Sequence, residues 1–428
     1  MNVVIIGGGL TGLVAAYRLS KIGKGVTVLE KQEDVGGVLA SIKKDNYYIE
    51  KYYHHVFKGD SRFIQIVNEL GLSNEFRFTN ARTAFLYGDR FLKLTTPQDL
   101  LFFKPLSFFD KIRLGILILI MKRVSDFKKY DDISAKEWIV ANAGKNVFEN
   151  LFRPMLRGKF GDDLNEISAA WFIERIKTRS KRSFSGERLG YIDGGFHLFI
   201  QRLAEEIWRN GGVIRTNVEA KNIRVENNKV EEIAFDDETI RTSMIISTIS
   251  PRELTRIVEF DSEFGRKLDS LDYQGCICVL FGFKRKITDY YWTNIIRDDI
   301  VFGAIVEHTN FQRLSNYGEH IIYLASYPEG KSRLWGLSDG RIFEIYFEDL
   351  KKIFPNLKEE EITWKKVVRD KYGGLIYRKG IKSNIVNSQT SIKGLLIGGM
   401  FNSYPDRNIN TSIRIGEECA KLASRSDQ

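Results

Sequence analysis

The sequence is poor in cysteine, proline and histidine, because its 428 residues include only 3, 7 and 5 of them. Cys276, Cys278 and Cys419 are an odd number and do not form the framework of a disulfide-stapled secreted fold. The histidines and cysteines also lack the spacing of metal ligands, so we expect no metal site. Few prolines and no low-complexity tract argue against flexible linkers and long disordered segments.

Long hydrophobic runs are absent as well. The most apolar region, residues 100–121, is broken by Lys104, Asp110 and Arg113, and its longest uninterrupted run is shorter than the roughly 20 residues that span a bilayer. Residues 1–6 pass directly into an apolar strand pattern, which leaves no room for a signal peptide. Together with the unpaired cysteines, this predicts a reducing, cytoplasmic setting.

What the chain has in quantity is apolar residues, at 43% of the sequence, enough to bury a large core. The first of them form a strand that breaks into glycines. In order, the segment consists of a strand at 3–6, Gly7, Gly8, Gly9 and Gly12, a helical pattern over 13–22, and a strand at 26–29 that ends in Glu30. This order is typical of a dinucleotide-binding unit.

Each of these positions has a physical role in binding a dinucleotide. Gly7 permits the tight turn after the strand, and Gly9 lets backbone N–H groups approach a pyrophosphate. Gly12 lets the helix pack closely on the strand, and the helix N-terminus favours the phosphate charge. Glu30 follows roughly 20 residues later, where a carboxylate can accept hydrogen bonds from a ribose diol.

Further glycine pairs follow along the chain. Gly36 and Gly37 come shortly after Glu30, residues 191–196 lead into a helix at 198–209, and residues 394–400 precede a final helix. In this order the segments resemble the FAD-dependent amine oxidase and protoporphyrinogen oxidase superfamily over nearly the whole chain. That superfamily also includes phytoene desaturases and UDP-galactopyranose mutases.

The resemblance implies that FAD is the cofactor. It implies non-covalent FAD, because covalent attachment in the family uses a Gly-Gly-Cys context that Cys419 does not match. The residues that the resemblance places at the FAD site are Gly7, Gly9, Leu10, Thr11, Gly12, Glu30, Lys31, Gly36, Gly37, Val38, Val218, Gly399, Met400, Asn410 and Thr411.

The expected fold class is α/β, with a discontinuous Rossmann-like FAD-binding domain and an inserted α+β substrate domain of an antiparallel sheet plus helices. The FAD-binding domain is expected at 1–78, 188–252 and 372–428, and the substrate domain at 79–187, which is mainly helical, and at 253–371. Within the substrate domain the patterns predict helices at 110–124, 134–143 and 338–354, and strands at 276–284, 300–307 and 320–327.

The flavin supplies the electron-accepting atom itself, so the chain needs only to position a substrate and tune the ring. In the superfamily, the segment corresponding to 49–57 passes beside the flavin ring. His54 or His55 in it is a candidate acid or base. Adjacent residues on a strand point opposite ways, and His55 is preferred because His-Val-Phe resembles the His-x-Phe of the mutases. The alternative is a histidine that only packs under the cofactor.

Candidates for substrate contact are Arg153, Arg157 and Tyr404, which lie in segments that resemble cavity-lining parts of the superfamily. Trp171 and Phe172 are expected in the core rather than as a stacking platform. A run of cations could bind phosphate, carboxylate or an anionic membrane, or could form a solvated face. It consists of Arg175, Lys177, Arg179, Lys181, Arg182 and Arg188.

The partners are expected to be a small-molecule substrate, anionic or apolar, and no nucleic acid, since no such module is recognised. Residues 100–121 either form a buried helical hairpin over the substrate cavity, which is preferred, or insert into one leaflet of a membrane. Three functions stay open. They are an FAD-dependent oxidoreductase, which leads, a redox-neutral nucleotide-sugar mutase, and a non-catalytic carrier of the same fold.

Overall fold

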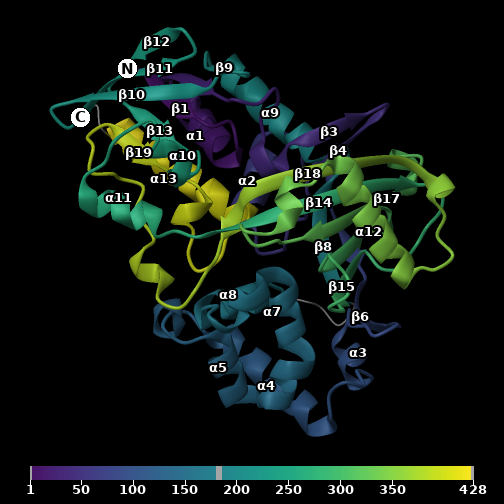
Figure 1. The fold of residues 1–428 in the computed structure, drawn as a ribbon. Coiled ribbons are helices and arrows are strands. Elements are labelled where there is room, and N and C mark those ends of the chain that lie inside the picture. The colour runs from purple at the N-terminus through teal and green to yellow at the C-terminus, as the bar shows by residue number, and fades with distance from the viewer. Residues whose placement is uncertain (1, 180–185, 426–428) are drawn as a thin grey trace.

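The computed structural model of the chain describes residues 2–179 and 186–425. Its elements gather in three regions (Figure 1). A parallel sheet with its helices lies at the upper left, a large sheet lies at the right, and a group of helices lies below.

The parallel sheet has five strands in the order β19-β13-β1-β2-β9, and every neighbouring pair is parallel. Its strands are short and almost wholly apolar, because helices or loops cover both faces. They are β1 (Asn2–Ile6), β2 (Gly25–Leu29), β9 (Val213–Arg215), β13 (Ile245–Ser247) and β19 (Leu395–Ile397). The expected Rossmann-like arrangement is confirmed, and it is discontinuous because distant parts of the chain supply neighbouring strands.

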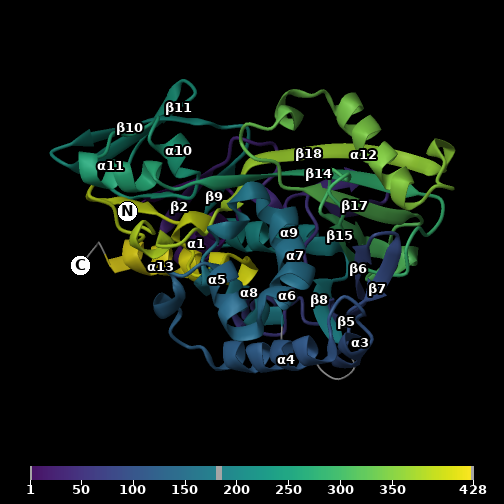
Figure 2. The same ribbon diagram turned by 60° about the horizontal axis from the view of Figure 1, so that its bottom comes forward.

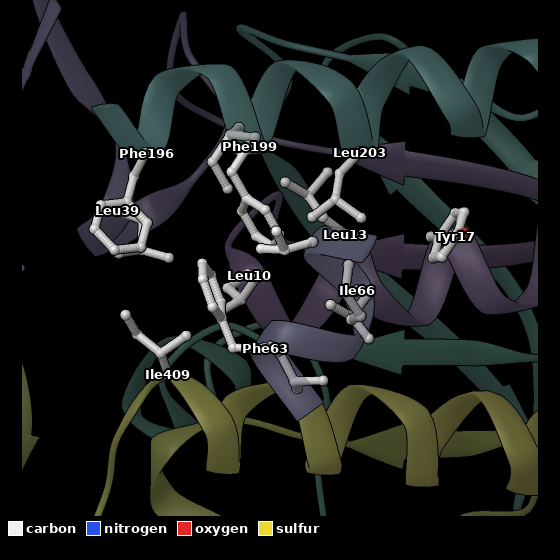
Figure 3. Packing of buried hydrophobic residues seen from close by; sticks show 14 of the residues in the cluster. Leu10, Leu13, Tyr17, Leu39, Phe63, Ile66, Phe196, Phe199, Leu203 and Ile409 are labelled. Carbon is white, nitrogen blue, oxygen red and sulfur yellow. The ribbon is translucent and has the colours of Figure 1, made fainter. Parts of the chain in front are cut away.

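Four helices pack around this sheet and form one hydrophobic cluster. They are α1 (Leu10–Lys21), α2 (Ser61–Glu69), α9 (Gly195–Arg209) and α13 (Ile409–Arg425). Figure 3 shows Phe63 of α2 between Phe199 of α9 and Ile409 of α13. Helices α1 and α13 approach closely at Gly416, where a Cβ would lie 2.6 Å from the Thr11 carbonyl oxygen.

Smaller antiparallel sheets complete the fold. One contains β10 (Ala220–Glu226), β11 (Lys229–Phe235) and β12 (Glu238–Arg241). The others pair β3 (Ser41–Lys44) with β4 (Tyr47–Glu50), and β5 (Phe76–Ala81) with β8 (Glu187–Ile192). Two short helices, α10 (Pro251–Leu254) and α11 (Ser262–Asp269), follow β13. The domain boundaries expected from the sequence stay predictions.

The second region is a seven-stranded sheet in the order β18-β14-β17-β16-β15-β6-β7. Its pairs are antiparallel except for β15 and β6. The strands are β6 (Thr83–Tyr87), β7 (Arg90–Lys93), β14 (Tyr273–Phe283), β15 (Trp292–Ile296), β16 (Ala304–Glu307), β17 (His320–Ser326) and β18 (Ile362–Leu375). Helix α12 (Asp339–Ile353) packs on this sheet. The strands and helix expected at 276–354 are confirmed with shifted ends, whereas β6 and β7 were not expected.

The third region is helical and is seen from below in Figure 2. It contains α3 (Pro97–Leu101), α4 (Phe108–Arg123), α5 (Ala135–Ala143), α6 (Lys145–Val147), a π-helical turn (Phe148–Phe152), α7 (Arg153–Phe160) and α8 (Ala169–Arg179). The expected helix at 134–143 is confirmed, with Ser134 and Glu137 forming a reciprocal capping box.

Helix α4 lies at the outer edge of this region (Figure 2). One side is buried through Leu114, Leu117 and Met121. The expectation of a buried hairpin is wrong for the opposite side, where Phe108 and Phe109 are 68% and 72% exposed. We name the exposed set the α3–α4 apolar face, and it consists of Leu101, Phe102, Phe108, Phe109, Ile112, Ile116 and Leu119. Within the described residues, every helix is too short or too polar to cross a membrane.

Candidate cofactor and substrate site

The turn between β1 and α1 has the geometry that its glycines predict. Gly7 has a φ of +101°, and a Cβ there would lie 2.5 Å from Oγ1 of Thr248. A Cβ at Gly12 would lie 2.1 Å from the carbonyl oxygen of Gly7. Both positions therefore require glycine for the turn and for the close approach of α1 to the strand.

Gly9 requires glycine for a different reason. A Cβ at this position would enter open space, with the nearest atom being the Cα of Gly37 at 4.0 Å. The loop at Gly36 runs beside it, because the Gly36 N–H donates to the Gly8 carbonyl at 2.8 Å. Protein packing alone does not demand a glycine at position 9, whereas a pyrophosphate against these backbone groups does.

Glu30 closes the cradle at the end of β2. Its carboxylate accepts hydrogen bonds from the N–H groups of Gly8 at 2.7 Å and Gln32 at 2.8 Å. A carboxylate has about four lone-pair directions, so further directions are available for a ribose diol. The Val218 N–H donates to the Glu30 backbone oxygen at 2.9 Å, which places this predicted adenine contact beside the ribose acid. The cradle fits a dinucleotide.

The C-terminal residues of the predicted site join the cradle through the start of α13. The Thr11 hydroxyl donates to the Ser412 carbonyl at 3.3 Å, so the N-terminal turns of α1 and α13 lie together. Thr411 donates its N–H and its hydroxyl to Oδ1 of Asn408 at 2.8 and 3.0 Å. The Oδ1 of Asn410 accepts the backbone N–H of Arg62 at 2.8 Å.

The remaining predicted cofactor residues lie around the same segments. Lys31 forms an ion pair with Glu253 at 2.6 Å. The Gly399 N–H donates to Oδ1 of Asn402 at 3.0 Å, and Met400 begins the short turn after β19. Val38 lies in the turn that follows Gly37. Their roles toward a cofactor stay predictions.

The two candidate histidines contact different elements, as their alternation predicts. Nδ1 of His54 donates to the Tyr52 carbonyl at 2.7 Å, and its ring meets Phe196 of α9 edge-on. His55 turns toward the residue before β15, and its Nδ1 lies 3.0 Å from the Tyr291 hydroxyl. Burial lowers the pKa of His54 to about 4 and the pKa of His55 well below its usual range. Both rings are therefore neutral near pH 7.

A cavity of about 110 Å³ lies between α7, α8 and the strands β15 and β16. We name it the inner cavity. Tyr53, next to the histidines, is part of its wall. Three cations and several aromatic rings also line it, and these are Lys159, Arg175, Arg179, Trp171, Phe172, Trp292 and Tyr327. Trp171 and Phe172 are buried, as expected, and they also form cavity wall.

The cations of the inner cavity are held in place by aromatic and acidic groups. The Lys159 ammonium lies 5.3 Å from the centroid of the Tyr327 ring and 5.6 Å from that of Trp171. Arg175 forms an ion pair with Asp406 at 3.3 Å, and the Trp171 indole N–H donates to the same carboxylate at 2.9 Å. Burial, and then the charge of Arg175, lower the pKa of Lys159 well below its usual range.

A larger cavity of about 660 Å³ adjoins the inner cavity, and we name it the outer cavity. Both cavities share wall residues, including Gly158 and Gly303. The predicted arginines Arg153 and Arg157 line the outer cavity. Arg157 forms an ion pair with Asp298 at 3.0 Å, and both arginines are partly exposed.

Other predicted substrate contacts lie elsewhere. Tyr404 donates to the Phe127 carbonyl at 3.4 Å and lines neither of these cavities. In the cationic run, Lys177 donates to the Val124 carbonyl and Arg188 to the Phe78 carbonyl. Lys181 and Arg182 lie outside the described residues. The run is therefore divided, with Arg175 and Arg179 facing a cavity.

Sequence reasoning missed Lys159, Tyr53, Tyr327 and Trp292 as cavity residues. For Lys159 a signal was present, because its helical neighbours at i−4, i−3 and i+1 are apolar and a lysine there lies on a buried face. Tyr53 lies in the segment 49–57 that was expected beside the flavin ring, so its sequence position was a signal. For Tyr327 and Trp292 no local signal existed, because their positions depend on the pairing of strands that are distant in the sequence.

Comparison with known proteins identifies the fold. The family described as flavin containing amine oxidoreductase matches residues 10–423 of the chain. The chain belongs to this family. Its cofactor is therefore FAD, in agreement with the cradle at Gly9 and Glu30.

Individual relatives are distant. Coproporphyrinogen III oxidase of Bacillus subtilis is 30% identical over 39% of this chain and 38% of its own length. The Staphylococcus aureus protein of the same name is 23% identical over 58% of this chain and 60% of its own length. The matched region thus spans less than two thirds of these relatives. A 15-cis-phytoene desaturase of Synechococcus elongatus is 23% identical over 83% of this chain and 80% of its own length.

Solved structures of this flavoprotein family share the fold over almost the entire chain. A putative protoporphyrinogen oxidase from an Exiguobacterium species has a TM-score of 0.81 at 19% identity, covering 100% of this chain and 99% of its own. Reduced UDP-galactopyranose mutase has a TM-score of 0.77 at 16% identity, covering 99% and 95%. At these identities the likeness establishes the fold alone.

Proposed function

We propose that this chain is an FAD-dependent oxidoreductase that removes a hydride from an organic substrate that extends from the outer cavity into the inner cavity. The observation that carries the proposal is the position of that cavity. Tyr53 forms part of its wall, and the next two residues are the histidines of the segment expected beside the flavin ring. A substrate in the cavity would thus lie next to the cofactor.

When bound, FAD supplies the two-electron acceptor. The substrate gives up a hydride and a proton, and an external acceptor such as oxygen or a quinone finally takes the two electrons. Gly9 and Glu30 hold the dinucleotide, while the walls of the inner cavity exclude water and orient the substrate. His55, whose Nδ1 lies 3.0 Å from the Tyr291 hydroxyl, stays the candidate proton acceptor beside the flavin, although it lines neither cavity and its lowered pKa makes it a weak base.

The names of the relatives suggest which substrates to try first. Coproporphyrinogen III oxidases and a 15-cis-phytoene desaturase are similar to parts of this chain. We therefore propose a cyclic or polyprenyl-like substrate class.

The second candidate is a redox-neutral nucleotide-sugar mutase. It is favoured by the His-Val-Phe sequence at 55–57 and by the arginines in the two cavities. A non-catalytic carrier is disfavoured, because such a protein has no need for an open position at Gly9 beside the Glu30 carboxylate.

The test is anaerobic absorption spectroscopy of the FAD-loaded protein. Bleaching of the flavin by coproporphyrinogen III, protoporphyrinogen or phytoene, without a nicotinamide, is the expected result. If none of them bleaches the flavin, but NADPH does and the reduced protein then isomerises UDP-galactopyranose, the mutase is correct instead. The matched control is the Gly9→Ala variant, which should bind little FAD and bleach little.

We also propose that the α3–α4 apolar face contacts the surface of an anionic membrane. Exposed cations surround this face, and they are Lys104, Arg113, Lys122 and Arg123. An apolar strip bordered by cations is complementary to acyl chains and acidic headgroups. This contact is peripheral, because α4 lies along the edge of the molecule (Figure 2).

A further inference from the structure

We propose that Lys159 and Arg175 form a subsite for an anionic group, carboxylate or phosphate, on a substrate with a flat aromatic or unsaturated body. The inference rests on the proposed function only in taking the inner cavity as the substrate site. It assigns the anion to different residues from Arg153 and Arg157, which the sequence suggested.

Cations from two helices meet at the inner cavity. Lys159 comes from α7 and Arg175 and Arg179 come from α8, and all three line the inner cavity. Long cationic side chains normally extend into solvent, since burial of a charge without a counter-charge is costly. Because two helices place cations at the same cavity, we infer that this positive charge serves the ligand that the cavity binds.

The acidic group at this cluster is already bound by other residues. Asp406 is the carboxylate at this cluster, and it is already bound by Arg175 at 3.3 Å and by the Trp171 indole at 2.9 Å. Within residues 2–179 and 186–425, no carboxylate forms an ion pair with Lys159. When protonated, Lys159 therefore carries a charge that an anionic ligand group would compensate.

The charge of the Lys159 amine depends on what lies beside it. Burial disfavours its charged form and lowers its pKa. An anion beside the amine would favour the charged form again, because opposite charges within about 4–6 Å stabilise one another. The aromatic rings of Tyr327 and Trp171 hold the amine in place without neutralising it.

The remaining wall of the inner cavity is largely aromatic. Trp292 and Phe172 supply flat apolar surface, and Tyr53 and Tyr327 share a hydrogen bond between their hydroxyl groups. The cavity therefore offers a cationic part beside an aromatic part. A ligand with an anionic substituent on a flat body satisfies both parts at once.

The subsite borders the outer cavity at Gly158 and Gly303, which line both cavities. The charged residues that line the outer cavity are Arg153, Arg157, Arg297, Lys331, Asp298 and Glu329, so cations outnumber carboxylates there. Cations along such a path attract an anion toward the inner cavity. The arginines that the sequence singled out therefore steer the anionic group, and Lys159 and Arg175 hold it.

The experiment compares benzoate, phenyl phosphate and benzamide, which share a ring and differ in the polar group. Binding to the FAD-loaded full chain is measured by calorimetry and by intrinsic tryptophan fluorescence, to which Trp171 and Trp292 contribute. We expect benzoate or phenyl phosphate to bind about tenfold to a hundredfold more tightly than benzamide, as for a hydrogen bond to a charged group. Whichever anion binds more tightly identifies the carboxylate or phosphate class.

The Lys159→Met variant should lose this preference, and Arg175→Lys should reduce it while keeping a cation near Asp406. Arg157→Met is the matched variant on the same helix, and as a steering residue it should slow association of the anions but retain the preference at equilibrium. Equal affinity of the wild type for all three probes would overturn the subsite. So would loss of the preference in Arg157→Met with retention in Lys159→Met.

Failure of the subsite is distinguishable from failure of the proposed function. The probes are not oxidised, so their binding is independent of turnover. A chain that prefers anions through Lys159 but bleaches with no organic substrate keeps the subsite and loses the oxidoreductase proposal. A chain that bleaches but binds all three probes equally keeps the oxidoreductase and loses the subsite.

Discussion

Gly9 is the residue whose lack of a side chain matters most for binding of the cofactor. At Gly7 and Gly12 a Cβ would meet protein atoms, so substitution there would damage the fold. At Gly9 a Cβ would enter the space in front of the backbone N–H groups. The fold can therefore tolerate alanine at this position, whereas a bound pyrophosphate cannot.

The first prediction follows. Gly9→Ala should weaken FAD binding at least about tenfold, or about 1.4 kcal/mol, with little change in the unfolding of the apoprotein. The flavin-to-protein absorbance ratio after purification and the melting temperature without FAD measure the two quantities. Gly115→Ala on α4, where a Cβ also meets nothing, is the control and should keep full flavin content. Normal FAD affinity in Gly9→Ala would contradict the placement of the cradle.

Glu307 is a second residue with an individual effect, and it lies outside the site. Its carboxylate is fully buried and accepts the N–H groups of Thr288 at 2.7 Å and Ile287 at 3.2 Å. Burial raises the pKa of this carboxyl to about 7. Of the neighbouring charges, Lys286 lowers the pKa and Asp289 raises it, and His320 lies 3.6 Å from the carboxylate. A carboxyl whose pKa is raised in the folded state binds more protons when folded than when unfolded.

The second prediction is a dependence of stability on pH. Protonation of Glu307 stabilises the fold fully below the unfolded pKa of about 4.3, and this contribution is lost as the pH rises through 7. The free energy of unfolding should fall by roughly 3 kcal/mol between pH 4.5 and 8 relative to Glu307→Gln. Urea titrations of both proteins with saturating FAD measure the difference. Parallel pH profiles for the two would show that Glu307 has an ordinary pKa.

At the scale of elements, α7 is positioned by its contact with the loop before β16. A Cβ on Gly303 would lie 2.7 Å from the Gly158 carbonyl oxygen, whereas a Cβ on Gly158 would lie 3.7 Å from the Gly303 Cα. The side chain of Gln274 also donates to the Lys159 carbonyl. These contacts hold the last turn of α7, and with it Lys159, against the large sheet.

The third prediction compares these two glycines. Gly303→Ala should lower the free energy of unfolding by about 1–3 kcal/mol, because the backbone of α7 must move. It should also weaken benzoate binding. Gly158→Ala on the facing helix should leave stability unchanged or raise it by up to about 1 kcal/mol. Equal effects of both substitutions, in denaturant titrations, would exclude this close contact as the anchor of α7.

Elements with a strong local pattern could be predicted, and elements that depend on distant partners could not. Ser134 and Glu137 cap α5 through contiguous residues, so the sequence alone revealed where this helix begins. The pattern of β14 likewise reads as a buried strand. By contrast, β6 forms a parallel pair with β15, more than a hundred residues away, and no residue pattern near β6 indicates this partner.

At the scale of the whole molecule, the α3–α4 apolar face is the feature without a partner. Its exposed residues on α4 recur at helical spacing, at Phe108, Ile112, Ile116 and Leu119. The opposite side of the same helix is buried against the helical region. A helix that is apolar on both sides needs a second apolar environment, and the bordering cations favour an acidic lipid surface.

The fourth prediction concerns this face. The full chain should co-sediment with phosphatidylglycerol vesicles and much less with phosphatidylcholine vesicles. The double variant Phe108→Ser/Phe109→Ser should lose most of this binding, since both rings are exposed. The control Ile22→Ser/Trp208→Ser removes exposed apolar side chains elsewhere and should retain it. Vesicle binding that is unaffected by the Phe substitutions, or a dimer that they dissociate, would assign the face to another partner.

The sequence by itself determined the cofactor. The strand, glycines and helix of the cradle are contiguous, so their turn and helix dipole form from neighbouring residues. Only the tertiary structure decided which cations face the substrate cavity. Arg153 and Arg157 lie one helical turn apart on one side of α7, and Lys159 lies on the other side. Which side became the wall of the inner cavity depended on packing against β15 and β16, strands that fold in from a distant part of the chain.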